Sequence, residues 1–106
     1  LFALSVNFIV IHQAHVYSIL LEEPGFGEEG SEIMLYLQSF MELYGENFRS
    51  FKHGAFHGAM SGITLGLPIL GIPAYYEGKS FKYVLLNTLF WVISFALTGG
   101  VLCQMV

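Results

Sequence analysis

The most constraining feature of this sequence is the confinement of its charged side chains to two short windows. The eight acidic and four basic residues all lie within 22–52 or 77–82, which leaves charge-free stretches at 1–21, 53–76 and 83–106. At a helical rise of about 1.5 Å per residue, each stretch reaches about 30 Å or more, the thickness of the hydrocarbon core of a bilayer. The pattern therefore predicts an all-α protein built as a transmembrane helical bundle.

The composition indicates that the chain lies in a lipid bilayer. Apolar residues make up 55% of the sequence and charged residues 11%, whereas about a quarter of the residues in soluble proteins are charged. A water-soluble fold would have to cover its apolar helices with very little polar surface. Nucleic-acid binding is not expected, because the net charge is −4 and basic residues are few. Cys103 is the only cysteine, which excludes an internal disulfide and a cysteine-based metal cluster.

We expect a single membrane domain over 1–106, with spans over about 1–21, 53–76 and 83–105 and a short amphipathic helix over 31–44. This last helix has apolar residues at helical spacing but is too polar to cross a membrane. It is expected to lie at the membrane surface or to cap the bundle. The turn between the last two spans is short, so these spans are antiparallel neighbours, and its lysines favour a cytoplasmic location for the turn.

The first predicted span is unusually polar for a helix that faces lipid. It contains Asn7, His12, Gln13 and His15 within an otherwise apolar run. Amide and imidazole side chains in hydrocarbon need hydrogen-bond partners. We therefore expect this face of the span to pack against protein or water.

The second predicted span has a stripe of glycines spaced by four: Gly54, Gly58, Gly62 and Gly66. Glycines at this GxxxG spacing line one helix face and allow a second backbone to approach closely, which favours helix association in a bilayer. The stripe predicts a helix-packing surface for another membrane protein subunit or for a second copy of the chain.

Four histidines are the candidate functional residues of this sequence. His12 and His15 are three apart in the first span, and His53 and His57 are four apart in the second, so each pair shares a helical face. The long loop places both pairs near the same side of the membrane, where the imidazoles could converge. They would then suit a transition-metal ion, or axial ligation of a haem. Interhelical hydrogen bonding and a proton relay are the alternatives, and no cofactor is favoured.

The chain resembles a family of bacterial membrane proteins. The resemblance rests on the segment 48–58 (FRSFKHGAFHG), on the basic turn 77–82 and on Asn87. These features are similar to the domain of unknown function 1761, in particular to its versions from Bacteroidetes-type bacteria. The resemblance implies a small bundle of about four spanning helices with no established activity. Family members usually carry a further N-terminal span, so the chain is expected to be truncated at its N-terminus.

The leading functional prediction is a non-catalytic accessory subunit of a larger complex, such as a respiratory one, in the bacterial cytoplasmic (inner) membrane. An enzyme is not expected, because the sequence has no phosphate-binding glycine loop, dinucleotide fingerprint or nucleophile elbow. The alternatives are a metal- or haem-binding membrane protein that uses the four histidines and a small transporter.

Overall fold

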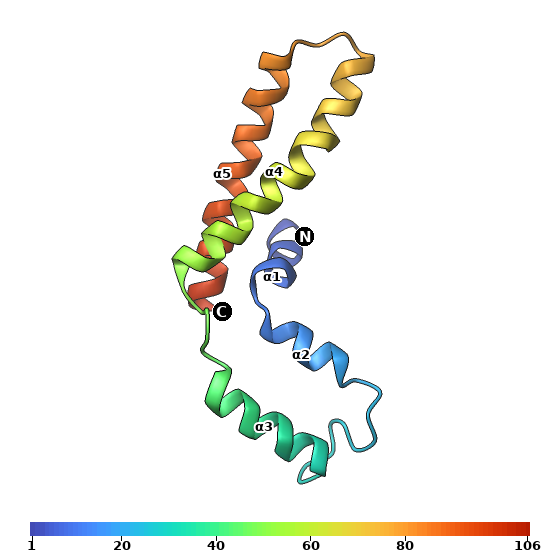
Figure 1. Cartoon of the computed structure of the whole chain (residues 1–106), viewed down its shortest axis with the longest axis vertical. Coiled ribbons are helices and arrows are strands. Elements are labelled where there is room, and N and C mark those ends of the chain that lie inside the picture. Colours follow the sequence, from blue (N-terminus) through green and yellow to red (C-terminus); the bar gives the residue numbers. More distant parts are fainter.

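The computed structural model describes all residues from 1 to 106 and is all-α, which confirms the predicted fold class. Figure 1 shows a long hairpin of two helices, a short helix packed against one end of it, and two further helices that form an arch beneath that end. The molecule is elongated, with extents of 60 × 27 × 17 Å. The helices are α1 (Phe2–Val10), α2 (Gln13–Ile19), α3 (Glu32–Tyr44), α4 (Phe51–Tyr76) and α5 (Phe81–Met105).

The hairpin of α4 and α5 contains the two helices that are long and apolar enough to cross a membrane, with 26 and 25 residues. Each begins with a serine cap: Ser50 Oγ accepts from the His53 backbone N–H at 3.3 Å, and Ser80 Oγ accepts from the Tyr83 N–H at 3.2 Å. Gly78, with φ +68°, supplies the left-handed conformation that the tight turn requires. Local sequence signals thus define where each helix of the hairpin begins and where the chain turns between them.

The glycine stripe of α4 faces α5 within the same chain. Gly54, Gly58 and Gly62 are buried, and a methyl group added to Gly54 would collide with the Gly99 carbonyl. A methyl group on Gly58 would collide with the Phe95 carbonyl in the same way. The close backbone approach expected from this stripe is therefore made between two helices of one molecule, and these glycines are covered by α5.

The fourth glycine of the stripe lies in a looser part of the hairpin. A methyl group on Gly66 would lie 3.8 Å from Thr88 Cγ2 and from Trp91 Cβ, which is ordinary van der Waals contact. The two helices are therefore packed most tightly at the end where α4 begins. This is also the end that α1 contacts.

The first apolar stretch is not the single helix expected over 1–21. It forms α1 and α2, which meet at a bend of 84°, so the stretch can cross a membrane only as a broken span. Ile11 at the break is extended, with φ −103° and ψ 99°. The polar residues of this stretch stabilise the break, because His15 Nε2 donates to the free Phe8 carbonyl at 3.0 Å. The buried Cys103 thiol approaches the Val10 carbonyl at 3.7 Å.

The small core of the protein lies where α1 meets the hairpin. It consists of Val6, Val10, Ile11 and Cys103, all buried. The remaining helices, α2 and α3, lie away from this core and are joined to each other by polar contacts. Gln13 Nε2 donates to the Gly45 carbonyl at 2.7 Å and to the Asn47 carbonyl at 3.0 Å.

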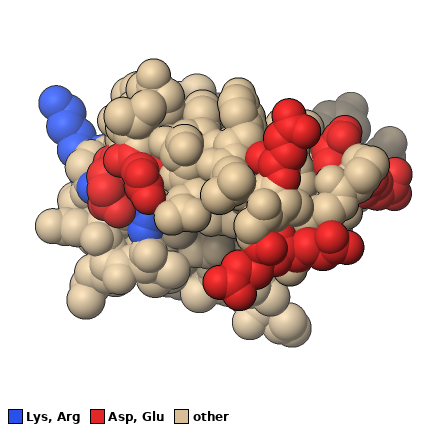
Figure 2. All heavy atoms as spheres, turned by 90° about the horizontal axis from the view of Figure 1, so that it is seen from below, with Lys and Arg blue, Asp and Glu red and all other residues tan.

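The loop before α3 and the helix itself form an acidic end of the molecule. Ser31 caps α3, since its Oγ accepts from the Met34 N–H at 3.3 Å. Seen from this end, acidic side chains outnumber basic ones (Figure 2). The amphipathic helix expected over 31–44 is present as α3.

Candidate functional site

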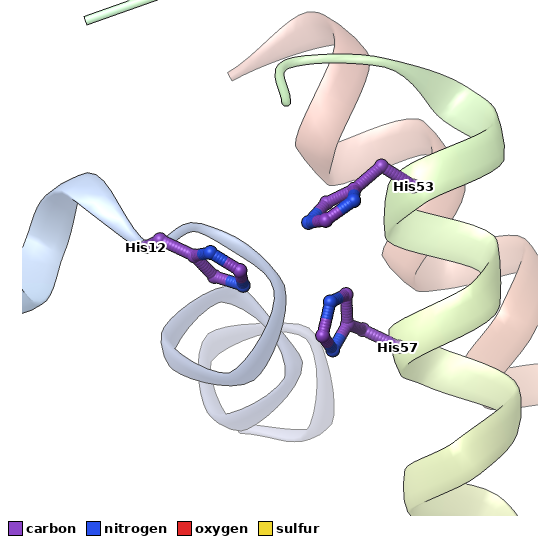
Figure 3. A group of neighbouring side chains, drawn as sticks. All are labelled: His12, His53 and His57. Atoms are coloured by element: carbon purple, nitrogen blue, oxygen red, sulfur yellow. The ribbon is translucent and has the colours of Figure 1, made fainter. Parts of the chain in front are cut away.

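Three of the four histidines converge at the junction of the broken span and the hairpin. His12 comes from the break between α1 and α2, and His53 and His57 come from the first turns of α4 (Figure 3). One ring nitrogen from each lies within 4.8 Å of those of the other two. The His12 ring centroid is 5.0 Å from that of His53 and 4.9 Å from that of His57, and His53 and His57 are 4.5 Å apart.

Local structure explains how the three side chains meet. His53 and His57 are four residues apart, so they project from the same face of α4, one turn above the other. The Ser50 cap fixes the start of that helix and hence the position of its first turn. His12 reaches this face only because the helix breaks at Ile11 and turns by 84°.

His15, the fourth predicted ligand, lies outside this cluster. Its Nε2 is engaged by the Phe8 carbonyl at 3.0 Å, and it is absent from the group of converging donors. His12 and His15 both follow the break at Ile11, but only His12 lies with the histidines of α4. His15 thus contributes to the break that positions His12, while His12, His53 and His57 form the site.

Phe48 and Gln13 support the site, and neither was singled out as a site residue from the sequence. Phe48 has a left-handed backbone with φ 61°, rare for a non-glycine residue, and its ring centroid lies 5.0 Å from that of His53. Its carbonyl accepts from Cys103 Sγ at 3.2 Å. Gln13 binds the preceding segment, at Gly45 and Asn47. The polarity of Gln13 was the only sequence signal for these contacts.

The arrangement is suited to a metal ion that prefers nitrogen ligands. His53 Nε2 is buried and has no hydrogen-bond partner in the protein. Neutral imidazoles are good ligands for zinc, copper and nickel ions. Two nitrogens on a tetrahedral zinc ion are about 3.3 Å apart, since each Zn–N bond is about 2.0–2.1 Å. Donors already within 4.8 Å therefore need only small side-chain rotations to reach one ion.

The donor set is three histidines, with no carboxylate or thiolate in the group. A tetrahedral ion held in this way would keep one coordination position for a ligand from outside the protein. Catalytic zinc sites share this feature, whereas structural zinc sites have four protein ligands. The geometry can therefore hold an ion and leave it reactive towards a small molecule.

Comparison with known proteins gives a family and no further relative. No curated protein and no solved structure matches the chain. The region matched by a family covers α3, α4 and all but the last two residues of α5, so it includes His53 and His57 and begins after His12. The matching description is "Protein of unknown function (DUF1761)", over residues 30–103, and the chain therefore belongs to this family.

Proposed function

We propose that this membrane protein binds one divalent transition-metal ion through His12, His53 and His57. The observation that carries the proposal is the convergence of three imidazole nitrogens within 4.8 Å from two segments that are far apart in the sequence. Hydrogen bonding was the alternative role for the histidines, and His15 is the only one whose side chain makes such a bond within the protein. The three clustered rings are left with free donor atoms.

A single ion fits this cluster better than a haem does. The haem macrocycle lies between the axial ligands of its iron. Here the rings are packed against one another, with centroids 4.5 to 5.0 Å apart, so no slot for a flat macrocycle exists between them. The haem alternative is accordingly the weaker one.

The histidine cluster lies near the N-terminal end of α4, and this position weakens the binding of a cation only slightly. The N-terminal end of a helix carries partial positive charge, which disfavours a nearby cation by about 0.3–1 kcal/mol at an exposed site. Zinc binding to structural sites in small peptides contributes about 10–16 kcal/mol. The free energy gained by metal coordination is therefore much larger than the energy lost to the helix dipole.

Metal analysis of the purified full chain in lipid nanodiscs tests the proposal. After loading with Zn²⁺ and removal of free metal, we expect one ion per chain. Replacement of His57 by Ala should lower Zn²⁺ affinity by on the order of 100-fold or more, since loss of outer-shell partners alone lowers metal affinity 10–100-fold. His15→Gln is the matched control, because glutamine keeps a donor for the Phe8 carbonyl, and its affinity should be unchanged. Lack of stoichiometric metal in the wild-type protein would refute the proposal.

The accessory-subunit role in a bacterial cytoplasmic membrane complex stays a prediction. The glycine stripe that suggested it is covered by α5 within the chain, so an outside partner would have to contact other faces. Support comes from the many large apolar side chains exposed along α4 and α5, which lipid or another subunit would cover. Identification of proteins that co-purify in mild detergent tests this role, and a solitary monomer would contradict it.

A small transporter also stays a prediction, tested by substrate flux in liposomes.

A further inference from the structure

A cavity of about 390 Å³, broadly open to the surface, lies beside the three-histidine cluster, between the start of α2 and the end of α3. It is at the small end of the range for ligand pockets, which is about 300–1,000 Å³. Its wall includes the aromatic rings of Phe40, Tyr44 and Phe48 and the amide side chains of Gln13 and Asn47. The lining residues are His12, Gln13, Val16, Phe40, Tyr44, Asn47 and Phe48.

Two residues connect this cavity to the cluster. His12 lines the cavity and also supplies one of the three converging nitrogens. Phe48 lines the cavity and places its ring against His53. His12 is itself solvent-exposed, so an ion bound to it would be reachable from the cavity side.

The protein supplies only three donors, so a tetrahedral ion needs a fourth from elsewhere. No lysine or arginine lines the cavity, and no carboxylate does. A ligand there would thus find no charged partner apart from the metal. Aromatic walls favour a flat apolar body, which gains both from burial and from ring contacts.

We propose that this cavity binds a small uncharged molecule with a flat apolar body and one nitrogen, oxygen or sulfur atom that completes the coordination of the metal. The inference rests on the proposed metal-binding function and names the class of ligand that the same site takes. Gln13 holds this side of the cavity in place, since its amide N–H groups donate to the Gly45 and Asn47 carbonyls. The Asn47 side chain forms no hydrogen bond within the protein and is free to bind a polar edge of the ligand.

The test uses the full chain in lipid nanodiscs, loaded with Co²⁺, whose visible spectrum changes when its ligands change. The probes are imidazole and 4-phenylimidazole, which have the same donor atom but differ by one aromatic ring. Both should alter the Co²⁺ spectrum, and 4-phenylimidazole should bind about tenfold or more tightly, because its phenyl ring packs against the aromatic wall of the cavity.

Two variants locate the binding of the phenyl ring. Phe40→Ala should remove most of the preference for 4-phenylimidazole and leave imidazole binding unchanged. Val16→Phe should fill the cavity and exclude 4-phenylimidazole, while Co²⁺ and imidazole still bind. The matched control is Phe90→Ala on α5, which removes an exposed ring outside the cavity and should preserve the preference.

The outcomes separate this inference from the proposed function. If the wild-type protein gives no Co²⁺ spectrum, both are overturned. If Co²⁺ binds but neither probe changes its spectrum, the fourth position is not open and this inference alone is overturned. Equal affinity for the two probes would also overturn it, as expected if a lipid chain already occupies the cavity.

Discussion

At the scale of single residues, the polar side chains of the first apolar stretch mainly donate hydrogen bonds to backbone carbonyls. His15 binds the Phe8 carbonyl, and Gln13 binds those of Gly45 and Asn47. The His15 bond matters because a broken helix in an apolar environment leaves carbonyl groups without intrahelical partners, and the Gln13 bonds do the same for carbonyls at and after the end of α3. The proposed metal site therefore depends on residues that are not among its ligands, since the break is what brings His12 to α4.

Replacing Gln13 by Leu tests this dependence. The change removes two hydrogen bonds worth about 0.5–1.5 kcal/mol each and frees the segment after α3 from α2. We expect Zn²⁺ affinity to fall by about tenfold, as His12 becomes less well positioned while all three ligands remain. Gln38→Leu on α3 is the control, because its amide contacts only Glu42. An unchanged Zn²⁺ affinity in Gln13→Leu, measured by competition titration, would show that Gln13 does not position the site.

At the scale of secondary-structure elements, the α4–α5 hairpin depends on two backbones that touch at one end and separate towards the other. A methyl group on Gly62 would lie 2.6 Å from Val92 Cα, whereas on Gly66 its nearest contacts are at 3.8 Å. Glycine spacing alone does not reveal this gradient, because all four positions follow the same pattern. Backbone atoms of α5 are nearest to the first three glycines, and side-chain atoms are nearest to Gly66.

Alanine substitution at two positions of the stripe should separate these cases. Gly58→Ala forces the helices apart at the Phe95 carbonyl and should lower stability by about 1–3 kcal/mol, the usual effect of overpacking. Gly66→Ala has room for the methyl group and should be neutral or stabilising by up to about 1 kcal/mol, because alanine favours helix more than glycine does. Reversible unfolding in mixed micelles measures both. Equal losses at the two positions would contradict the packing described.

The charge-free stretches of this sequence were enough to predict the hairpin helices, because lipid imposes both their length and their apolar character. The break in the first stretch was not predictable in the same way. No proline or glycine marks Ile11 or His12, and the polar residues that stabilise the break look the same as residues that face a partner helix. For this reason the sequence grouped His15 with His12, whereas in the structure His15 binds the Phe8 carbonyl and only His12 joins the histidines of α4.

At the scale of the whole molecule, the two ends of the hairpin differ. One end has the histidine cluster, the cavity beside it and the acidic loop with α3, and the other has the short turn with Glu77, Lys79 and Lys82 (Figure 1). At about 1.5 Å per residue, the 26 residues of α4 extend about 39 Å, enough to place these ends on opposite sides of a bilayer. The proposed metal site would then open to one compartment only.

Single cysteines at the two ends test this arrangement with a membrane-impermeant maleimide. Cys103 is fully buried, so the unsubstituted chain should remain unlabelled and serve as the control. Glu28→Cys in the acidic loop should react when the reagent is outside intact cells. Glu77→Cys in the turn should react only in inverted vesicles, because the two lysines of the turn favour the cytoplasmic side. Labelling of both cysteines from the same side would contradict a spanning hairpin, and reversed labelling would place the metal site on the cytoplasmic side.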